Sequence, residues 1–166
     1  MTIEAAIAAA LEGVPAHAHP HLLRVILHLS QTDDPTLLVL RGHLLLEELI
    51  NAAIAASVRD SRHLTSARLS YAQSLALLKA IVGVHPADRS WAFLTRLGVL
   101  RNALSHRLEV PALERDMDAL IAIVAPAPKG AIVKGQERTY RFTLAVAFVA
   151  GRLTSLLAPA TSQPAT

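Results

Sequence analysis

Hydrophobic residues recur at helical intervals along most of this chain. Apolar positions are spaced three and four residues apart, and Ala and Leu, which are strong helix formers, dominate them. The β-branched residues that favour strands are less frequent. This pattern predicts an all-α fold, a compact up-and-down bundle of about five to six helices.

Proline, glycine and capping residues predict where these helices begin and end. The segment Thr32-Asp33-Asp34-Pro35 offers an N-cap followed by a proline at the first helical position, which should begin the longest helix. Gly83 stands where a C-cap is expected. The predicted helices cover residues 1–12, 20–31, 35–58, 66–82, 88–108, 111–124 and 139–157, and a loop is predicted at 126–138.

The chain length of 166 residues is typical of one domain. We expect a single helical domain over residues 1–158 and a disordered tail over residues 159–166. The helix predicted at 139–157 is apolar on most of its circumference. Such a helix is either central to the core or shared with another chain, and in a domain of this size both uses are compatible.

The mean hydropathy of +0.39 is high and raises the question of a membrane span. The most apolar stretches, residues 49–58, 119–125 and 142–151, are interrupted by charge well before the ~20 apolar residues that a bilayer requires. The N-terminal segment carries Glu4 and Glu12 and lacks a basic leader. We therefore expect a soluble cytoplasmic protein with no membrane contact.

Charge and composition narrow the chemistry only slightly. The net charge of +3 is compatible with a polyanionic partner, but the basic residues are scattered, as in an ordinary slightly basic enzyme. The absence of cysteine excludes disulfides, thiolate metal sites and cysteine nucleophiles. His17, His19 and His21 lie close together, but Pro20 breaks their helical spacing and no carboxylate is adjacent. No metal or cofactor is expected.

The helix predicted at 88–108 carries a polar cluster away from its core-facing side. At ~100° per residue, Asn102 and His106 lie together opposite the apolar stripe, and Arg101 lies at its edge with a long side chain. For each residue alone, an exposed helix face is the simpler explanation. Gly98 lowers helix stability unless another element approaches closely, so we expect something to pack near this face. The apolar stripe consists of Phe93, Leu97, Leu100, Leu104 and Leu108.

The segment 97–109 resembles the HEPN (higher eukaryote and prokaryote nucleotide-binding) domains. Their signature is Arg-Asn, three further residues and His, which matches Arg101, Asn102 and His106. Segments 40–50 and 69–78 resemble the earlier helices of small bacterial members. The resemblance covers about residues 35–125 and leaves both ends of the chain outside it.

The resemblance implies metal-independent RNA cleavage, in which the ribose 2′-hydroxyl attacks the adjacent phosphorus and leaves a cyclic phosphate. His106 would move protons, Arg101 would hold phosphate oxygens, and Asn102 would orient either His106 or a phosphate oxygen. Some HEPN members place a polar residue from an earlier helix beside the motif, so Glu47 or Glu48 is an auxiliary candidate. Simple ion pairing, such as Glu47 with His43, is the alternative explanation of those carboxylates.

Two functions follow from the resemblance. The first is a HEPN-like endoribonuclease, a toxin or defence component that acts as a homodimer on RNA and is restrained by an antitoxin or other regulatory protein. The second is a non-catalytic helical module that binds RNA, a nucleotide or a protein, which the lack of a strongly basic surface favours. A small-molecule enzyme has little support because no Gly-rich phosphate loop or nucleophile elbow is present.

Overall fold

A computed structural model describes residues 16–106, 110–124 and 137–157. The helix predicted at 1–12, most of the loop predicted at 126–138 and the tail predicted at 159–166 lie outside these residues. The described residues form one short 3-10 turn and seven α-helices, with no strand among them, so the predicted all-α fold is confirmed. The elements are η1 (Ala16–Ala18), α2 (His19–Leu29), α3 (Pro35–Ser57), α4 (Arg62–Ala67), α5 (Tyr71–Val82), α6 (Ser90–His106), α7 (Leu113–Val124) and α8 (Glu137–Thr154).

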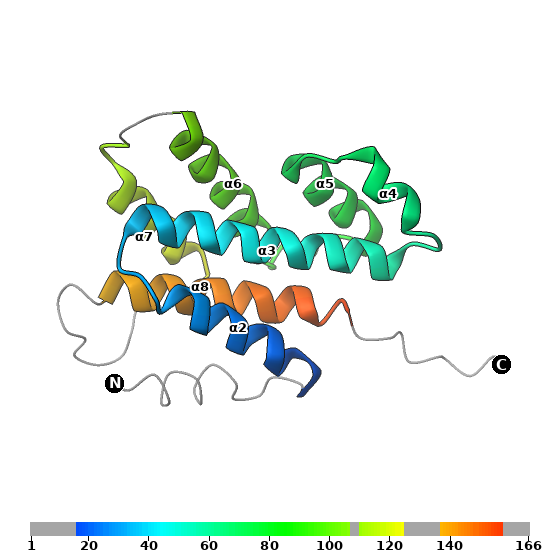
Figure 1. Cartoon of the computed structure of the whole chain (residues 1–166), viewed down its shortest axis with the longest axis horizontal. Coiled ribbons are helices and arrows are strands. Elements are labelled where there is room, and N and C mark those ends of the chain that lie inside the picture. The colour runs from blue at the N-terminus through cyan, green and yellow to red at the C-terminus, as the bar shows by residue number, and fades with distance from the viewer. Residues whose placement is uncertain (1–15, 107–109, 125–136, 158–166) are drawn as a thin grey trace.

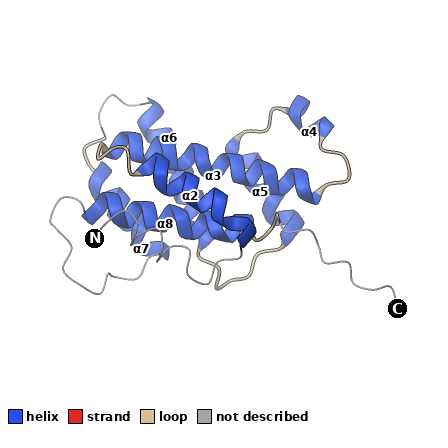
Figure 2. Ribbon diagram, turned by 60° about the horizontal axis from the view of Figure 1, so that its bottom comes forward, coloured by secondary structure: helices blue, strands red, loops and turns tan. Residues whose placement is uncertain are grey.

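Helix α3 is the centre of the bundle and contacts α2, α5, α6, α7 and α8. Helices α8 and α2 pack on one side of α3, whereas α5 and α6 lie on the other side (Figure 1). The short helix α4 lies at the periphery, beside the C-terminal end of α3, in both views (Figures 1 and 2). This arrangement places the helix with the Arg-Asn-x-x-x-His motif, α6, next to α3 and α5.

One hydrophobic core connects these helices. Its buried residues come from α2, α3, α5, α6, α7 and α8. Gly42 allows α3 and α8 to approach closely, because a Cβ atom at this position would lie 3.0 Å from Cε1 of Phe142. The largest fully buried side chains include Phe93, Phe142, Leu46, Ile50 and Met117.

The predicted start of the longest helix and the predicted C-terminal end of α5 are confirmed. The Asp34 side chain accepts hydrogen bonds from the backbone N–H groups of Thr36, at 2.7 Å, and of Leu37, at 3.0 Å. Asp34 is therefore the N-cap of α3, and Pro35 occupies its first turn. Gly83 ends α5 with a φ angle of +71°, which a residue without a Cβ adopts at little cost.

The single helix predicted at 66–82 is wrong in its first part. The chain forms α4 earlier, breaks at Arg68, which has a left-handed φ of +46°, and begins again at Tyr71. The cause is a capping box: the Ser70 hydroxyl accepts from the Gln73 N–H, and the Gln73 side chain accepts from the Ser70 N–H. Local polar hydrogen bonds therefore outweigh the apolar periodicity that runs across the break.

Helix α8 is central to the core, one of the two uses that its apolar circumference predicted. It packs on α2, α3 and α7, and Phe142, Val146 and Val149 are completely buried. Phe148 is exposed on the opposite side, so use of α8 by a second chain stays a prediction. None of the helices in the described ranges is long and apolar enough to cross a membrane.

Candidate functional site

A cavity of about 630 Å³ lies between α3, α5 and α6. Helix α3 contributes residues from its middle, α5 contributes a face that runs from Tyr71 in its first turn to Lys79 in its last, and α6 contributes the face that carries the Arg-Asn pair. The floor and sides also include small and apolar residues such as Ala72, Leu75 and Val99. The polar side chains that line the cavity are His43, Glu47, Ser70, Tyr71, Lys79, Thr95, Arg101 and Asn102.

Arg101 and Asn102 both line this cavity, as neighbours on α6. Nη1 of Arg101 donates to Oδ1 of Asn102 at 3.3 Å. Arg101 is half-buried, whereas Asn102 is exposed at the cavity mouth. The amide therefore holds the guanidinium at the edge of the cavity, where its other N–H donors can reach an anionic group.

His106 lies outside the cavity. It is the last residue of α6, it is exposed, and it does not line the space that Arg101 and Asn102 share. Because it follows Asn102 by four residues, it occupies the same side of the helix one turn further on. In a single chain the structure thus brings two of the three predicted site residues together and leaves the third beyond the rim.

His43 is the site residue that the sequence reasoning missed. It is 2% exposed, and its Nδ1 atom has no hydrogen-bond partner within the described part of the chain. Oε2 of Glu47 is 3.7 Å from that atom. Burial, and secondly the positive charge of Arg101, lower the pKa of His43 to about 4, so the imidazole is neutral at pH 7.

A signal for this burial was present in the sequence. His43 follows Val39 by four residues and precedes Leu46 and Ile50 by three and seven, which is the spacing of one helix face. All three of these apolar residues are completely buried. The wheel of α3 therefore places the imidazole on the core side and not, as expected for a surface ion pair with Glu47, in solvent.

Tyr71 forms the wall between His43 and α6. Its ring centroid lies 4.2 Å from that of His43, and its hydroxyl donates to the backbone carbonyl of Leu94 at 2.9 Å. Burial, and secondly the charge of Glu47, raise the pKa of Tyr71, so the phenol keeps its proton. Its ring packs directly on Gly98, where a Cβ atom would lie 2.7 Å from Cε1. The expected close approach at Gly98 is confirmed.

The two auxiliary carboxylates occupy different surroundings. Glu47 lines the cavity, and its side chain is 30% exposed. Glu48 points away from it toward α2, where Oε2 lies 2.6 Å from Nη1 of Arg24. Both members of that pair are more than half exposed, so water screens their attraction. Only Glu47 is placed to act on a molecule in the cavity.

The charges around the cavity favour an anionic occupant. Among the described residues that line it, Lys79 and Arg101 are cationic, Glu47 is anionic, and His43 is neutral at pH 7. Nζ of Lys79 is 3.4 Å from the Thr95 hydroxyl, which keeps the ammonium group on the same side as α6. The arrangement can therefore hold a phosphate group next to an unprotonated imidazole.

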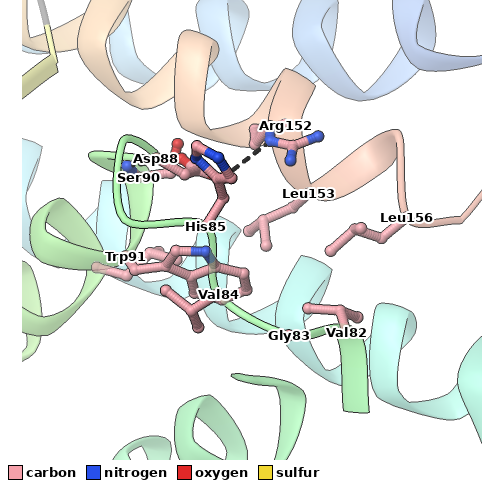
Figure 3. Close-up of a pocket in the computed structure, with 11 residues that line it drawn as sticks. Val82, Gly83, Val84, His85, Asp88, Ser90, Trp91, Arg152, Leu153 and Leu156 are labelled. Carbon is pink, nitrogen blue, oxygen red and sulfur yellow. Dashed lines mark hydrogen bonds and ion pairs between the residues drawn. The ribbon is translucent and has the colours of Figure 1, made fainter. Parts of the chain in front are cut away.

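A second cavity, of about 330 Å³, lies between the α5–α6 loop and the end of α8 (Figure 3). Nε of Arg152 donates to Oδ2 of Asp88 at 3.0 Å, and Oδ1 accepts from the Ser90 N–H. Burial raises the pKa of Asp88, but hydrogen bonds from Ser90 and Arg152 lower it further, so that the net shift is downward. The Asp88 carboxylate and the Arg152 guanidinium form an ion pair in a cavity that apolar Trp91 and Leu153 also line. The ion pair between Arg152 and Asp88 anchors the loop to α8.

The close contact at Gly98 leads to a testable prediction. In Gly98→Ala the new methyl group would collide with the Tyr71 ring, which the Leu94 carbonyl and His43 hold in place. Overpacking of this kind costs about 1–3 kcal/mol, more than the ~1 kcal/mol that Ala adds to helix stability. We expect a net loss in urea unfolding. Tyr71→Ala removes the obstructing ring, so Gly98→Ala should lower the free energy of unfolding less in a chain that already carries Tyr71→Ala. If the effects of the two substitutions on stability are simply additive, the explanation is wrong.

Within the described ranges, no group of three or more His, Asp or Glu side chains is close enough to hold a metal ion. No protein-family model, curated protein or solved structure matches the chain. The cavity between α3, α5 and α6, together with the Arg-Asn-x-x-x-His motif of α6, is the candidate functional site of the described residues.

Proposed function

We propose that this chain is a HEPN-like endoribonuclease that cleaves RNA without a metal ion. The observation that carries the proposal is the joint position of Arg101 and Asn102, which are hydrogen-bonded to each other at the mouth of one cavity. A phosphodiester at this mouth would meet the guanidinium fork directly. The resemblance of α6 to the HEPN motif supports the same reading.

The reaction needs no external nucleophile. The ribose 2′-oxygen attacks the adjacent phosphorus, the bond from phosphorus to the 5′-oxygen breaks, and a 2′,3′-cyclic phosphate and a 5′-hydroxyl remain. The protein must stabilise charge on the phosphorane and move two protons. Arg101 supplies the charge, Asn102 orients the guanidinium, and His106, which lies outside the cavity of its own chain, provides a proton-transfer group.

A second copy of the chain would place His106 closer to the reacting phosphate. Val99 lines the cavity, is 63% exposed and lies on the side of α6 that also carries Asn102 and His106. An exposed apolar residue beside a polar motif is suited to a self-complementary contact. We propose a cytoplasmic homodimer, a toxin or defence component whose cleft is blocked by an antitoxin or other regulatory protein.

The test is cleavage of end-labelled single-stranded RNA by the purified chain in the presence of EDTA. Native protein should release fragments that end in a 2′,3′-cyclic phosphate, and His106→Ala should cleave about 10²-fold more slowly. His28→Ala is the matched control, because His28 is also exposed in the last turn of its helix but belongs to α2. Equal cleavage by native protein and His106→Ala would remove the catalytic role of His106.

A non-catalytic RNA-binding module is the second candidate. The exposed position of His106 outside the cavity is the observation that favours it. In this case the native chain would bind RNA with an affinity that falls as salt rises, Arg101→Ala would bind more weakly, and no cleavage would occur.

A further inference from the structure

The buried face of α3 presents an unsatisfied imidazole to the cavity. Nδ1 of His43 is enclosed and has no hydrogen-bond partner in the part of the chain that the structure describes. A buried polar atom without a partner lowers stability by about 1–3 kcal/mol and is uncommon in folded proteins. An atom of this kind in the wall of a charged cavity therefore indicates a functional role.

Glu47 is placed to accept a hydrogen bond from Nδ1 of His43. Its Oε2 atom is 3.7 Å from Nδ1, about 1 Å beyond the ~2.7–2.9 Å of a charge-assisted hydrogen bond. The Glu47 side chain is partly exposed, and a change of rotamer that moves Oε2 toward Nδ1 would close the gap. With Nδ1–H donated to the carboxylate, the lone pair of the ring would lie on Nε2.

We propose that His43, oriented by Glu47, accepts the proton of the attacking 2′-hydroxyl in the RNA cleavage proposed above, on which this inference rests. The O2′–H bond breaks and its proton passes to Nε2 of His43, while O2′ bonds to phosphorus. The bond from phosphorus to the 5′-oxygen then breaks, and that oxygen takes a proton from His106 or water. The products are the 2′,3′-cyclic phosphate and the 5′-hydroxyl.

The surroundings of His43 suit an acceptor. The titratable and charged groups that line the cavity with it are Glu47 from α3, Tyr71 and Lys79 from α5, and Arg101 from α6. Burial and Arg101 keep the imidazole unprotonated at neutral pH, as a base requires. Arg101 would hold the phosphate next to this ring. His106, which is exposed at the end of α6, would donate a proton to the leaving 5′-oxygen.

Two substrates separate the roles of the two histidines. RNA has a poor leaving group that needs a proton, whereas uridine 3′-(p-nitrophenyl phosphate) has a good one that does not. We expect His43→Gln to slow cleavage of both substrates about 10²-fold. His106→Ala should slow cleavage of RNA alone. Thermal unfolding and circular dichroism report whether each variant is folded.

Glu47→Gln tests the orientation of His43 even if His43→Gln does not fold. The carboxylate favours the protonated ring, so its loss should move the rise of the rate with pH to lower pH and slow cleavage about tenfold. Glu48→Gln is the matched control, because Glu48 pairs with Arg24 away from the cavity. It should leave both the rate and the pH profile unchanged.

The possible results distinguish this inference from the proposed function. If native protein cleaves RNA and His43→Gln cleaves both substrates at the native rate, His43 is not the acceptor and the proposed function still stands. If the pH profile of Glu47→Gln matches that of Glu48→Gln, Glu47 does not orient His43; this inference is then overturned, and the proposed function still stands. If native protein cleaves neither substrate, the proposed function and this inference are both overturned.

Discussion

Arg101→Ala is expected to slow RNA cleavage about 10³-fold, the largest effect on activity of any single change at the site. The guanidinium lies at the mouth of the cavity and is held by Asn102, so it would meet the phosphorane charge without reorganising. The measurement is the single-turnover rate constant on labelled RNA at saturating protein. Arg101→Lys should recover only a small part of the rate, because an ammonium group lacks the planar fork.

Arg96→Ala is the matched control for this experiment. Arg96 belongs to the same helix and is exposed, but it does not line the cavity. Its removal changes the net charge of the chain by the same amount as removal of Arg101. If both variants lose the same activity, the effect is a general one of charge on RNA binding, and the proposed contact with the reacting phosphate is wrong.

Phe142→Ala is expected to lower the free energy of unfolding by about 3–5 kcal/mol, the largest single loss of stability. The ring is completely buried and packs on the backbone of α3 at Gly42. Its removal would leave a cavity between α8 and α3 that the closely packed helices cannot fill. Urea unfolding followed by circular dichroism measures the change.

The same experiment tests whether α8 belongs to the core although it lies outside the HEPN resemblance. Phe148→Ala is the matched control, because Phe148 is on the same helix and 58% exposed. It should change stability by only a few tenths of a kcal/mol. A loss in Phe142→Ala no larger than that in Phe148→Ala would show that α8 contributes little to the stability of the bundle.

Most helix positions were predictable because they depend on neighbours in the sequence. Asp34 with Pro35, and Gly83, act within one turn of their own helices, so their effects appear in the sequence as short motifs. The break at Arg68 was missed although Ser70 and Gln73 form an equally local motif. Apolar periodicity continues on both sides of the break and predicts one continuous helix, whereas the capping box between the two segments begins a new one.

The cavity depends on contacts between residues far apart in the chain. Tyr71 reaches Gly98 and Leu94 on α6, and His43 meets Tyr71 across the space between α3 and α5. A helical wheel gives the side on which a residue lies, but it does not say which helix covers that side. For this reason the wheel grouped Asn102 with His106 and placed Arg101 at the edge of the apolar stripe, but it did not reveal that Arg101 and Asn102 share a cavity that His106 does not line.

By itself, the sequence determined the helical class, the start of α3, the end of α5, the buried positions Phe93, Leu97 and Leu100 of α6 and the need for a close neighbour at Gly98. These features follow from backbone geometry and from side chains within a few residues of one another. Only the tertiary structure decided that His43 and Arg101 line one cavity, that Glu47 rather than Glu48 faces it, and that α8 completes the core. Pairing between helices depends on how the whole chain packs, which no local pattern specifies.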